Sequence, residues 1–310
     1  MSDHSLRQSV RLLSVLLTLC LLFTACSPQV PRHKEGDLGY IPVSSSPVSV
    51  DGLTAKAYFI YDCAAKEFVA IRGTDQPIYP ASITKLLTAL YALTLLSPDE
   101  VITPGDELSL VGEGSSIAYV KSHHTLTAEM LIQGMMIPSG NDAAYALAAA
   151  AGKKLDPSLS GKAAVERFMK GLNEYAKSLG LCYTTFTVPD GLAGEEHFTG
   201  VEDLAIIARH AFANELIRTY GGMAEANVTY ASGHTNTWVN TNLLLIEDSS
   251  YYDARVKSGK TGSMEGSYNL VFLAEENGKE YIIGIFGSES KTARFADGIC
   301  AMNAVFGEAR

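Results

Sequence analysis

The sequence predicts an α+β fold, and the order of its expected elements is the reason. Two short segments rich in β-prone residues, 55–61 and 68–72, flank a polar turn near the start of the folded body. A long block of helical patterns follows. Strand patterns return only at 270–274 and 281–286, joined by an Asn-Gly turn, before a last amphipathic helix. Strands at both ends of a helical block are typical of α+β proteins, because α/β folds alternate strand and helix.

The expected helices have apolar residues at helical spacing and residues that favour helix ends. Their ranges are 82–96, 127–136, 142–151, 162–179 and 201–212. We expect Gly152 to end the third helix and Gly180 to cap the fourth. Thr199 and Glu202 have the spacing of a capping box before the fifth. Between the first two helices, residues 101–110 are expected to be extended.

Composition excludes two broad classes of protein. The 310 residues are 47% hydrophobic and 19% charged, which is typical of a globular chain and not of a disordered one. The net charge is −10 and no basic patch interrupts it, so a nucleic-acid partner is not expected.

The first 25 residues are expected to be an export signal. Arg7 and Arg11 form a basic start, and residues 12–23 are almost wholly apolar but too short for a comfortable membrane span. The sequence Leu22-Phe23-Thr24-Ala25-Cys26 resembles a bacterial lipobox, which predicts lipidation of Cys26. An ordinary secretory signal that is cut nearby is the alternative.

The signal divides the chain into three expected parts. Residues 1–25 are the signal peptide, 26–50 are a flexible, lipid-anchored tether rich in Pro, Ser and Gly, and 51–310 are the folded domain. We therefore expect an exported protein, held by an N-terminal lipid at the extracytoplasmic face of a bacterial membrane or secreted.

The cysteines and histidines predict no metal site and no disulfide framework. Cys63, Cys182 and Cys300 stay in the folded domain, an odd number without a C-x-x-C pair. Whether two of them pair is left open. The adjacent His123 and His124 are not expected to bind a metal, and we expect no cofactor.

The stretch from Tyr79 to Lys85 is the first of three that indicate chemistry. Pro80 favours the start of a helix, and Ser82 and Lys85 lie three residues apart, on one face of that helix. A serine hydroxyl becomes a nucleophile when a base removes its proton, and a desolvated lysine can be that base. Taken alone, S-x-x-K is most often an ordinary helix start.

Two further stretches are polar where simple structural residues would serve. Residues 137–142, with Ser139 and Asn141, separate two apolar helices, although a helix N-cap would explain them equally well. Residues 256–263 contain Lys-Thr-Gly ahead of an apolar strand, and could equally be a protected edge strand. A phosphate-binding loop is excluded because its first glycine would fall at Ala254.

Together the three motifs are specific. S-x-x-K at Ser82, S-x-N at Ser139 and K-T-G at Lys260 occur in the order found in penicillin-binding proteins and class A β-lactamases, with Gly140 in place of an aspartate. The chain is identified as a member of the serine-type D-alanyl-D-alanine carboxypeptidases, the low-molecular-mass penicillin-binding proteins. Further stretches that resemble this family are 80–90, 114–116, 190–192, 203–205 and 240–244.

The resemblance implies a β-lactamase/transpeptidase-like fold, in which a mostly helical lobe flanks an antiparallel sheet. It also implies that Ser82 forms an acyl-enzyme with the D-Ala-D-Ala end of a peptidoglycan pentapeptide, with Lys85 as base and Ser139 as proton relay. Burial and the charge of Lys260 are expected to lower the pKa of Lys85. The implied substrate-binding residues are Asn141, Lys260, Thr261, Gly262 and Ser263. β-Lactams would be covalent inhibitors.

Two departures from the family concern substrate preference. Thr241 stands where some members have an arginine near the substrate carboxylate. Ser263 and Glu265 stand in the stretch after Lys-Thr-Gly where family members more often have a bulky or aromatic residue and an alanine. Two alternatives remain. A class A-like β-lactamase would need a glutamate over the deacylating water, and Glu195 and Glu196 lack the pattern. A non-catalytic β-lactam or cell-wall binder would be expected to have lost part of the motif set.

Overall fold

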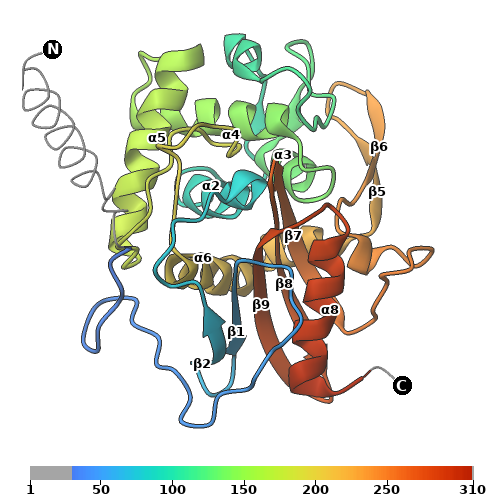
Figure 1. Ribbon diagram of the computed structural model, residues 1–310. Coiled ribbons are helices and arrows are strands. Elements are labelled where there is room, and N and C mark those ends of the chain that lie inside the picture. Colours follow the sequence, from blue (N-terminus) through green and yellow to red (C-terminus); the bar gives the residue numbers. More distant parts are fainter. Residues whose placement is uncertain (1–29, 309–310) are drawn as a thin grey trace, which may run out of the picture. The chain divides into compact units, whose positions relative to one another are not determined.

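The computed structural model describes residues 30–308, and it confirms the α+β class with an antiparallel sheet beside a mostly helical lobe (Figure 1). The predicted signal peptide and Cys26 lie outside the described residues. In the described part of the chain, no helix is long and apolar enough to cross a membrane.

Five antiparallel strands form the central sheet in the order β2-β1-β9-β8-β7. They are β1 (Ala57–Asp62), β2 (Glu67–Arg72), β7 (Val256–Met264), β8 (Ser267–Glu276) and β9 (Lys279–Ser288). Glu276 pairs with Lys279, so the predicted Asn-Gly hairpin joins β8 and β9. The hairpin predicted near the start of the folded body therefore pairs with the hairpin predicted near its end, because β1 lies beside β9. The β7 strand forms one edge of the sheet.

Each face of the sheet has its own core. α8 (Ala293–Phe306) packs along β8 and β9 on one face, where Phe272, Ile283 and Phe295 are buried (Figure 1). The other face carries the helical lobe, and Phe59 and Phe286 join its larger core. The sheet is thus covered on both faces, and β7 is placed against the lobe.

Six helices make up the lobe. They are α2 (Thr84–Ala92), α3 (Ala128–Met136), α4 (Asn141–Leu155), α5 (Gly161–Ser178), α6 (Val201–Ala213) and α7 (Glu215–Gly222). Every residue of α2 is buried, so this helix fills the centre of the lobe, as its apolar pattern predicts. The shorter elements are η1 (Ala81–Ile83), β3 (Val101–Ile102), η2 (Asp106–Leu110), β4 (Leu126–Thr127), β5 (Glu225–Thr229), β6 (Thr235–Val239) and η3 (Leu243–Leu245).

Three local expectations are wrong. Residues 101–110 are extended only at Val101–Ile102 and then turn into the 3₁₀ helix η2. The α4 helix continues through Gly152 to Leu155. A β-carbon at Gly152 would collide with the Ala164 carbonyl of α5. The role of this glycine is close helix packing rather than helix termination.

The predicted capping box before α6 is also absent. No side chain caps this helix, whose N-cap residue is Gly200. Thr199 instead contacts Thr184 at 2.8 Å, and Glu202 accepts a hydrogen bond from the His33 backbone at 2.9 Å. Tertiary contacts have therefore replaced the local pairing.

The stretch before β1 differs from the flexible tether that its composition predicts. Phe68 in β2 donates a backbone hydrogen bond to Pro42 at 2.8 Å and accepts one from Ser44 at 2.8 Å. Farther along, Val48 donates to Val69, and the Val50 side chain is buried. Residues 42–50 thus lie on the edge of the sheet.

Candidate active site

Ser82 and Lys85 lie at the junction of η1 and α2. The Lys85 Nζ atom is 2.8 Å from Ser82 Oγ, which agrees with the spacing expected for one helical face. Ala81, immediately before the serine, has a positive φ of 49°, an uncommon conformation for alanine. Backbone strain beside a reactive group is typical of functional sites, where the surrounding packing maintains it.

Lys85 is completely buried, and three oxygen atoms surround its amine. Besides Ser82 Oγ, they are Asn141 Oδ1 at 2.7 Å and the Asp190 carbonyl at 3.1 Å. Burial lowers the pKa of Lys85 to about 8, while the charges of Asp190 and Asp142 oppose this shift. The amine is therefore a base within the reach of neutral pH.

The Ser139 loop joins α3 to α4 and places the Asn141 side chain beside this amine. Ser139 has a positive φ of 63°, which a serine rarely adopts. The Gly140 amide donates to the Gly134 carbonyl at 2.9 Å, and this bond closes the loop. Asn141 begins α4, so its amide side chain is held by a rigid helix.

The loop also anchors the opposite wall of the site. The buried carboxylate of Asp142 accepts hydrogen bonds from the Ala118 and Val120 amides at 2.7 and 2.8 Å. These bonds fix the segment that carries Ser116. The Ser116 carbonyl in turn accepts a hydrogen bond from the backbone amide of Asn141 at 2.8 Å.

Lys260 on β7 approaches the same point from the sheet. Its Nζ donates to Ser139 Oγ at 2.8 Å and to the Thr261 carbonyl at 3.0 Å, and its side chain is buried. Burial, then the charge of Lys85, lowers the pKa of Lys260 well below its usual value. The sequence predicts that the charge of Lys260 lowers the pKa of Lys85; in the structure, repulsion between the two charged amines contributes to the lowered pKa of Lys260.

β7 lies tightly against η1 because of Gly262. A β-carbon at this position would collide with the Pro80 carbonyl. Ser263 therefore follows directly beside the turn that carries Ser82. A cavity of about 380 Å³ is lined by both serines, together with Ser139, Thr241 and Thr261. A second cavity of about 380 Å³ also includes Ser82 and extends past Asn141.

Arg294 is the residue that sequence reasoning missed. It comes from α8, its side chain is buried, and its Nη1 donates to the Gly262 carbonyl at 3.0 Å and Ser263 Oγ at 2.7 Å. Burial lowers the pKa of Arg294 to about 10. It lines the cavity that Thr241 also lines, so a guanidinium is present although Thr241 replaces the arginine of some family members. No local pattern around Arg294 indicates this role.

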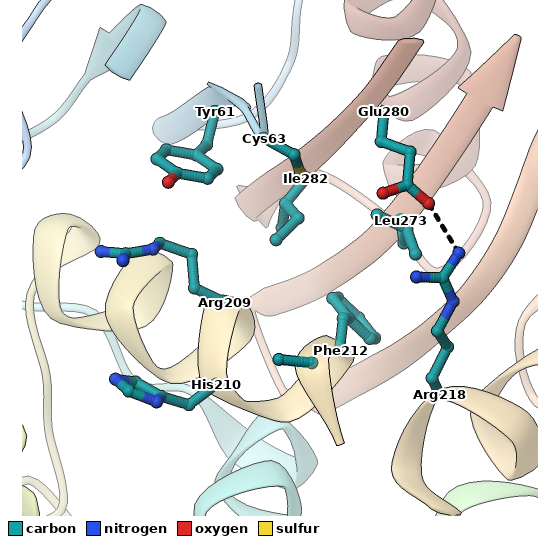
Figure 2. A pocket seen from close by; sticks show the side chains of 10 residues that line it. Tyr61, Cys63, Arg209, His210, Phe212, Arg218, Leu273, Glu280 and Ile282 are labelled. Carbon is teal, nitrogen blue, oxygen red and sulfur yellow. Dashed lines mark hydrogen bonds and ion pairs between the residues drawn. The ribbon is translucent and has the colours of Figure 1, made fainter. Parts of the chain in front are cut away.

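Another cavity, of about 370 Å³, lies at the far end of the sheet and contains none of the predicted site residues (Figure 2). Arg209 lies over the Tyr61 ring, and Arg218 forms an ion pair with Glu280 at 2.6 Å. Cys63 also lines it, and burial followed by nearby carboxylates raises the pKa of its thiol to about 11. A protonated thiol is a poor nucleophile.

The three cysteines of the described residues, Cys63, Cys182 and Cys300, are all free, which answers the question of their pairing. His124 is buried and accepts a hydrogen bond from the Lys121 amide at 3.2 Å. The eight predicted catalytic and substrate-binding residues, by contrast, line the two cavities that share Ser82 and Ser263, or lie directly beside residues that do.

Comparison with known proteins agrees with this arrangement. A family model described as D-alanyl-D-alanine carboxypeptidase matches residues 44–290. The chain is 30% identical to D-alanyl-D-alanine carboxypeptidase DacF of Bacillus subtilis over 233 residues, which are 73% of this chain but only 55% of DacF. It is 32% identical to D-alanyl-D-alanine carboxypeptidase of Streptomyces sp. strain K15, over 86% of this chain and 92% of that one.

Solved structures show the same fold. The crystal structure of the Streptomyces K15 DD-transpeptidase superposes with a TM-score of 0.73 at 30% identity and covers 84% of this chain and all of that one. Penicillin-binding protein D2 from Listeria monocytogenes, in its ampicillin-bound form, gives a TM-score of 0.67 at 25% identity, over 83% of this chain. The chain belongs to the Peptidase S11 family of D-alanyl-D-alanine carboxypeptidases.

Proposed function

We propose that this protein is a serine carboxypeptidase that removes the terminal D-alanine from peptidoglycan stem peptides. The observation that carries the proposal is the contact of Ser82 Oγ with a fully buried lysine amine, Lys85 Nζ, at 2.8 Å. Family membership supports the choice of substrate class, and the ampicillin complex of the Listeria relative supports β-lactams as covalent inhibitors.

In the proposed reaction, Ser82 Oγ attacks the carbonyl of the last peptide bond and loses its proton to Lys85. Ser139, which lines the same cavity as Ser82, relays that proton from Lys85 to the leaving amine, so that D-alanine departs, an acyl-enzyme remains and Lys85 is again unprotonated. Water then cleaves the ester. The Ser82 and Ser263 amides would stabilise the oxyanion, an effect of about 10²–10³ in rate per donor.

Lys260 and Thr261 would hold the free carboxylate of the substrate, with Gly262 providing close backbone approach. Support comes from the position of Lys260 Nζ against Ser139 Oγ and from the contact between Thr261 Oγ1 and Thr241 Oγ1 at 2.6 Å. Arg294 would add a second cation on the same wall. An exopeptidase needs such cations because its substrate ends in a carboxylate.

The arrangement does not favour a class A-like β-lactamase. Glu195 and Glu196 are exposed, and neither lines the two cavities that contain Ser82. Among the described residues, no glutamate side chain forms a hydrogen bond with Ser82 or Lys85. A purely binding role is also less well supported, because the buried amine and its low pKa serve bond cleavage rather than binding.

The first prediction concerns Ser82. The full chain should form a stable adduct with a fluorescent penicillin and release D-alanine from diacetyl-Lys-D-Ala-D-Ala. Ser82→Ala should lose the adduct and at least about 10³-fold in turnover, because it removes the nucleophile. Ser109→Ala, at an exposed serine, is the control and should behave like the parent. Rapid penicillin turnover without D-alanine release would instead identify a β-lactamase.

The second prediction is a pH profile. A general base acts in its unprotonated form, so kcat/KM should rise with pH and level off above the pKa of Lys85, about 8. The rate should fall about tenfold per pH unit on the acid side. Steady-state kinetics with the same peptide measure this, and a profile that is flat from about pH 6 to 9 would contradict Lys85 as the base.

The third prediction separates carboxylate recognition from chemistry. Lys260→Ala should reduce kcat/KM for the peptide acid by about 10- to 100-fold, because a charge-assisted hydrogen bond is lost. It should change far less for the C-terminal amide of the same peptide. Lys257→Ala, on the same strand but partly exposed, is the matched control. An equal loss for acid and amide would argue against a carboxylate role.

The fourth prediction concerns the N-terminus, where we propose a signal peptide and a lipid on Cys26. In a bacterial host, the full chain should incorporate a labelled fatty acid and fractionate with membranes. Cys26→Ser should abolish both, while Cys20→Ser, within the proposed signal, should leave them unchanged. Secretion of the parent without label would show an ordinary signal peptide instead.

A further inference from the structure

A second cluster of reactive side chains lies away from the active site, where the segment after Pro31 contacts the start of α6. Three donor atoms meet there, namely His33 Nε2, Cys182 Sγ and Asp203 Oδ1. The nitrogen lies 2.8 Å from the oxygen and 3.4 Å from the sulfur, and the sulfur lies 3.9 Å from the oxygen. Among the described residues, this is the group of three whose donors could hold one metal ion.

The separations between the three atoms match a coordination site. A tetrahedral zinc ion with ligands at 2.0–2.3 Å places neighbouring donors roughly 3.3–3.6 Å apart. Of the three observed distances, 3.4 Å lies within that range, 2.8 Å lies below it and 3.9 Å lies above it, so shifts of about half an ångström would suffice. The side chains of His33 and Asp203 are only 3% and 1% exposed, which fixes two of the three donors in place.

Neighbouring groups hold the Asp203 carboxylate in a fixed orientation through hydrogen bonds. The Asp203 Oδ2 atom accepts the Tyr183 amide at 2.8 Å and the Thr184 hydroxyl at 2.7 Å. Oδ1 is therefore the oxygen that faces His33 and Cys182. Oδ1 also accepts a hydrogen bond from the Cys182 backbone amide at 3.2 Å, and ligating carboxylates are commonly hydrogen-bonded by surrounding groups in this way.

Charge and access also suit a cation. Glu202 lies next to Asp203 in sequence and accepts the His33 backbone amide at 2.9 Å, so it adds a second carboxylate. Arg32 pairs with Glu202 at 3.3 Å, but its side chain is 57% exposed. Cys182 is exposed, which gives an ion a path to the buried imidazole and carboxylate.

We propose that His33, Cys182 and Asp203 form a zinc site. Imidazole, thiolate and carboxylate are the donors that zinc takes together, whereas magnesium and calcium prefer oxygen alone. The Pro31 carbonyl, 3.5 Å from Cys182 Sγ, or a water would complete a tetrahedron. Binding displaces the thiol proton, and any second proton on the imidazole, into solvent.

A metal ion at this site would cross-link segments that are distant in the sequence. His33 is 149 residues from Cys182 and 170 from Asp203, so the ion would close two long loops and tie the segment before β1 to α6. Because a site assembled from distant segments exists only in the folded chain, the free energy of binding stabilises the fold. The segment held in this way leads toward the proposed anchor.

The test is metal binding by the full chain after chelator treatment. The parent should bind one equivalent of zinc, and cobalt in its place should give the intense near-ultraviolet absorption of a thiolate–cobalt bond. Cys182→Ser should lose that band and, like His33→Gln, bind zinc at least about tenfold more weakly. Cys300→Ser removes another exposed cysteine and should match the parent in both measurements.

Thermal unfolding provides a second measurement that does not depend on the cobalt–thiolate absorption band. Zinc at about a hundredfold excess over its Kd should raise the Tm of the parent and of Cys300→Ser by on the order of 5 °C, and should leave the two cluster variants unchanged. The proposal is overturned if the parent binds no zinc, if cobalt binds without a thiolate band, or if Cys182→Ser retains the affinity of Cys300→Ser.

Discussion

The position of the Lys85 amine is the constraint on which the rest of the site depends. A buried ammonium is costly, and here the amine is surrounded by oxygen atoms of Ser82, Asn141 and Asp190. Each oxygen comes from a different part of the chain, so α2, the start of α4 and the turn at Asp190 must all pack correctly before the base exists. The α2 helix, which carries Lys85, is itself completely buried.

The second constraint is the balance of charge around that amine. Lys260 and Arg294 bring two more buried cations to the same region, and burial lowers the pKa of each of them. Asp142 and Asp190 are the buried carboxylates that favour the charged form of Lys85. Burial lowers the pKa of Lys85 and the two carboxylates raise it, so the Lys85 amine can change protonation near neutral pH. Active sites often contain such arrangements at a cost in the stability of the fold.

The sequence predicts well those features that depend on short patterns. The β1–β2 and β8–β9 hairpins and the contact of Ser82 with Lys85 follow from local spacing. The errors arise where tertiary contact outweighs local preference. Gly152 fits its neighbour Ala164 instead of ending a helix, and Thr199 bonds to Thr184 instead of capping one. Neither neighbour can be identified from the residues beside it.

The same reasoning explains why some site residues stay hidden in the sequence. Ser139 and Lys260 could be predicted because short motifs contain them, although 121 residues separate them. Arg294 belongs to no such motif and reaches Ser263 only because α8 crosses the sheet. His33, Cys182 and Asp203 are an extreme case, since each is alone in its segment. Donor atoms that converge without any sequence pattern have to be sought in the folded chain, and there the chemistry of the donors indicates the ligand.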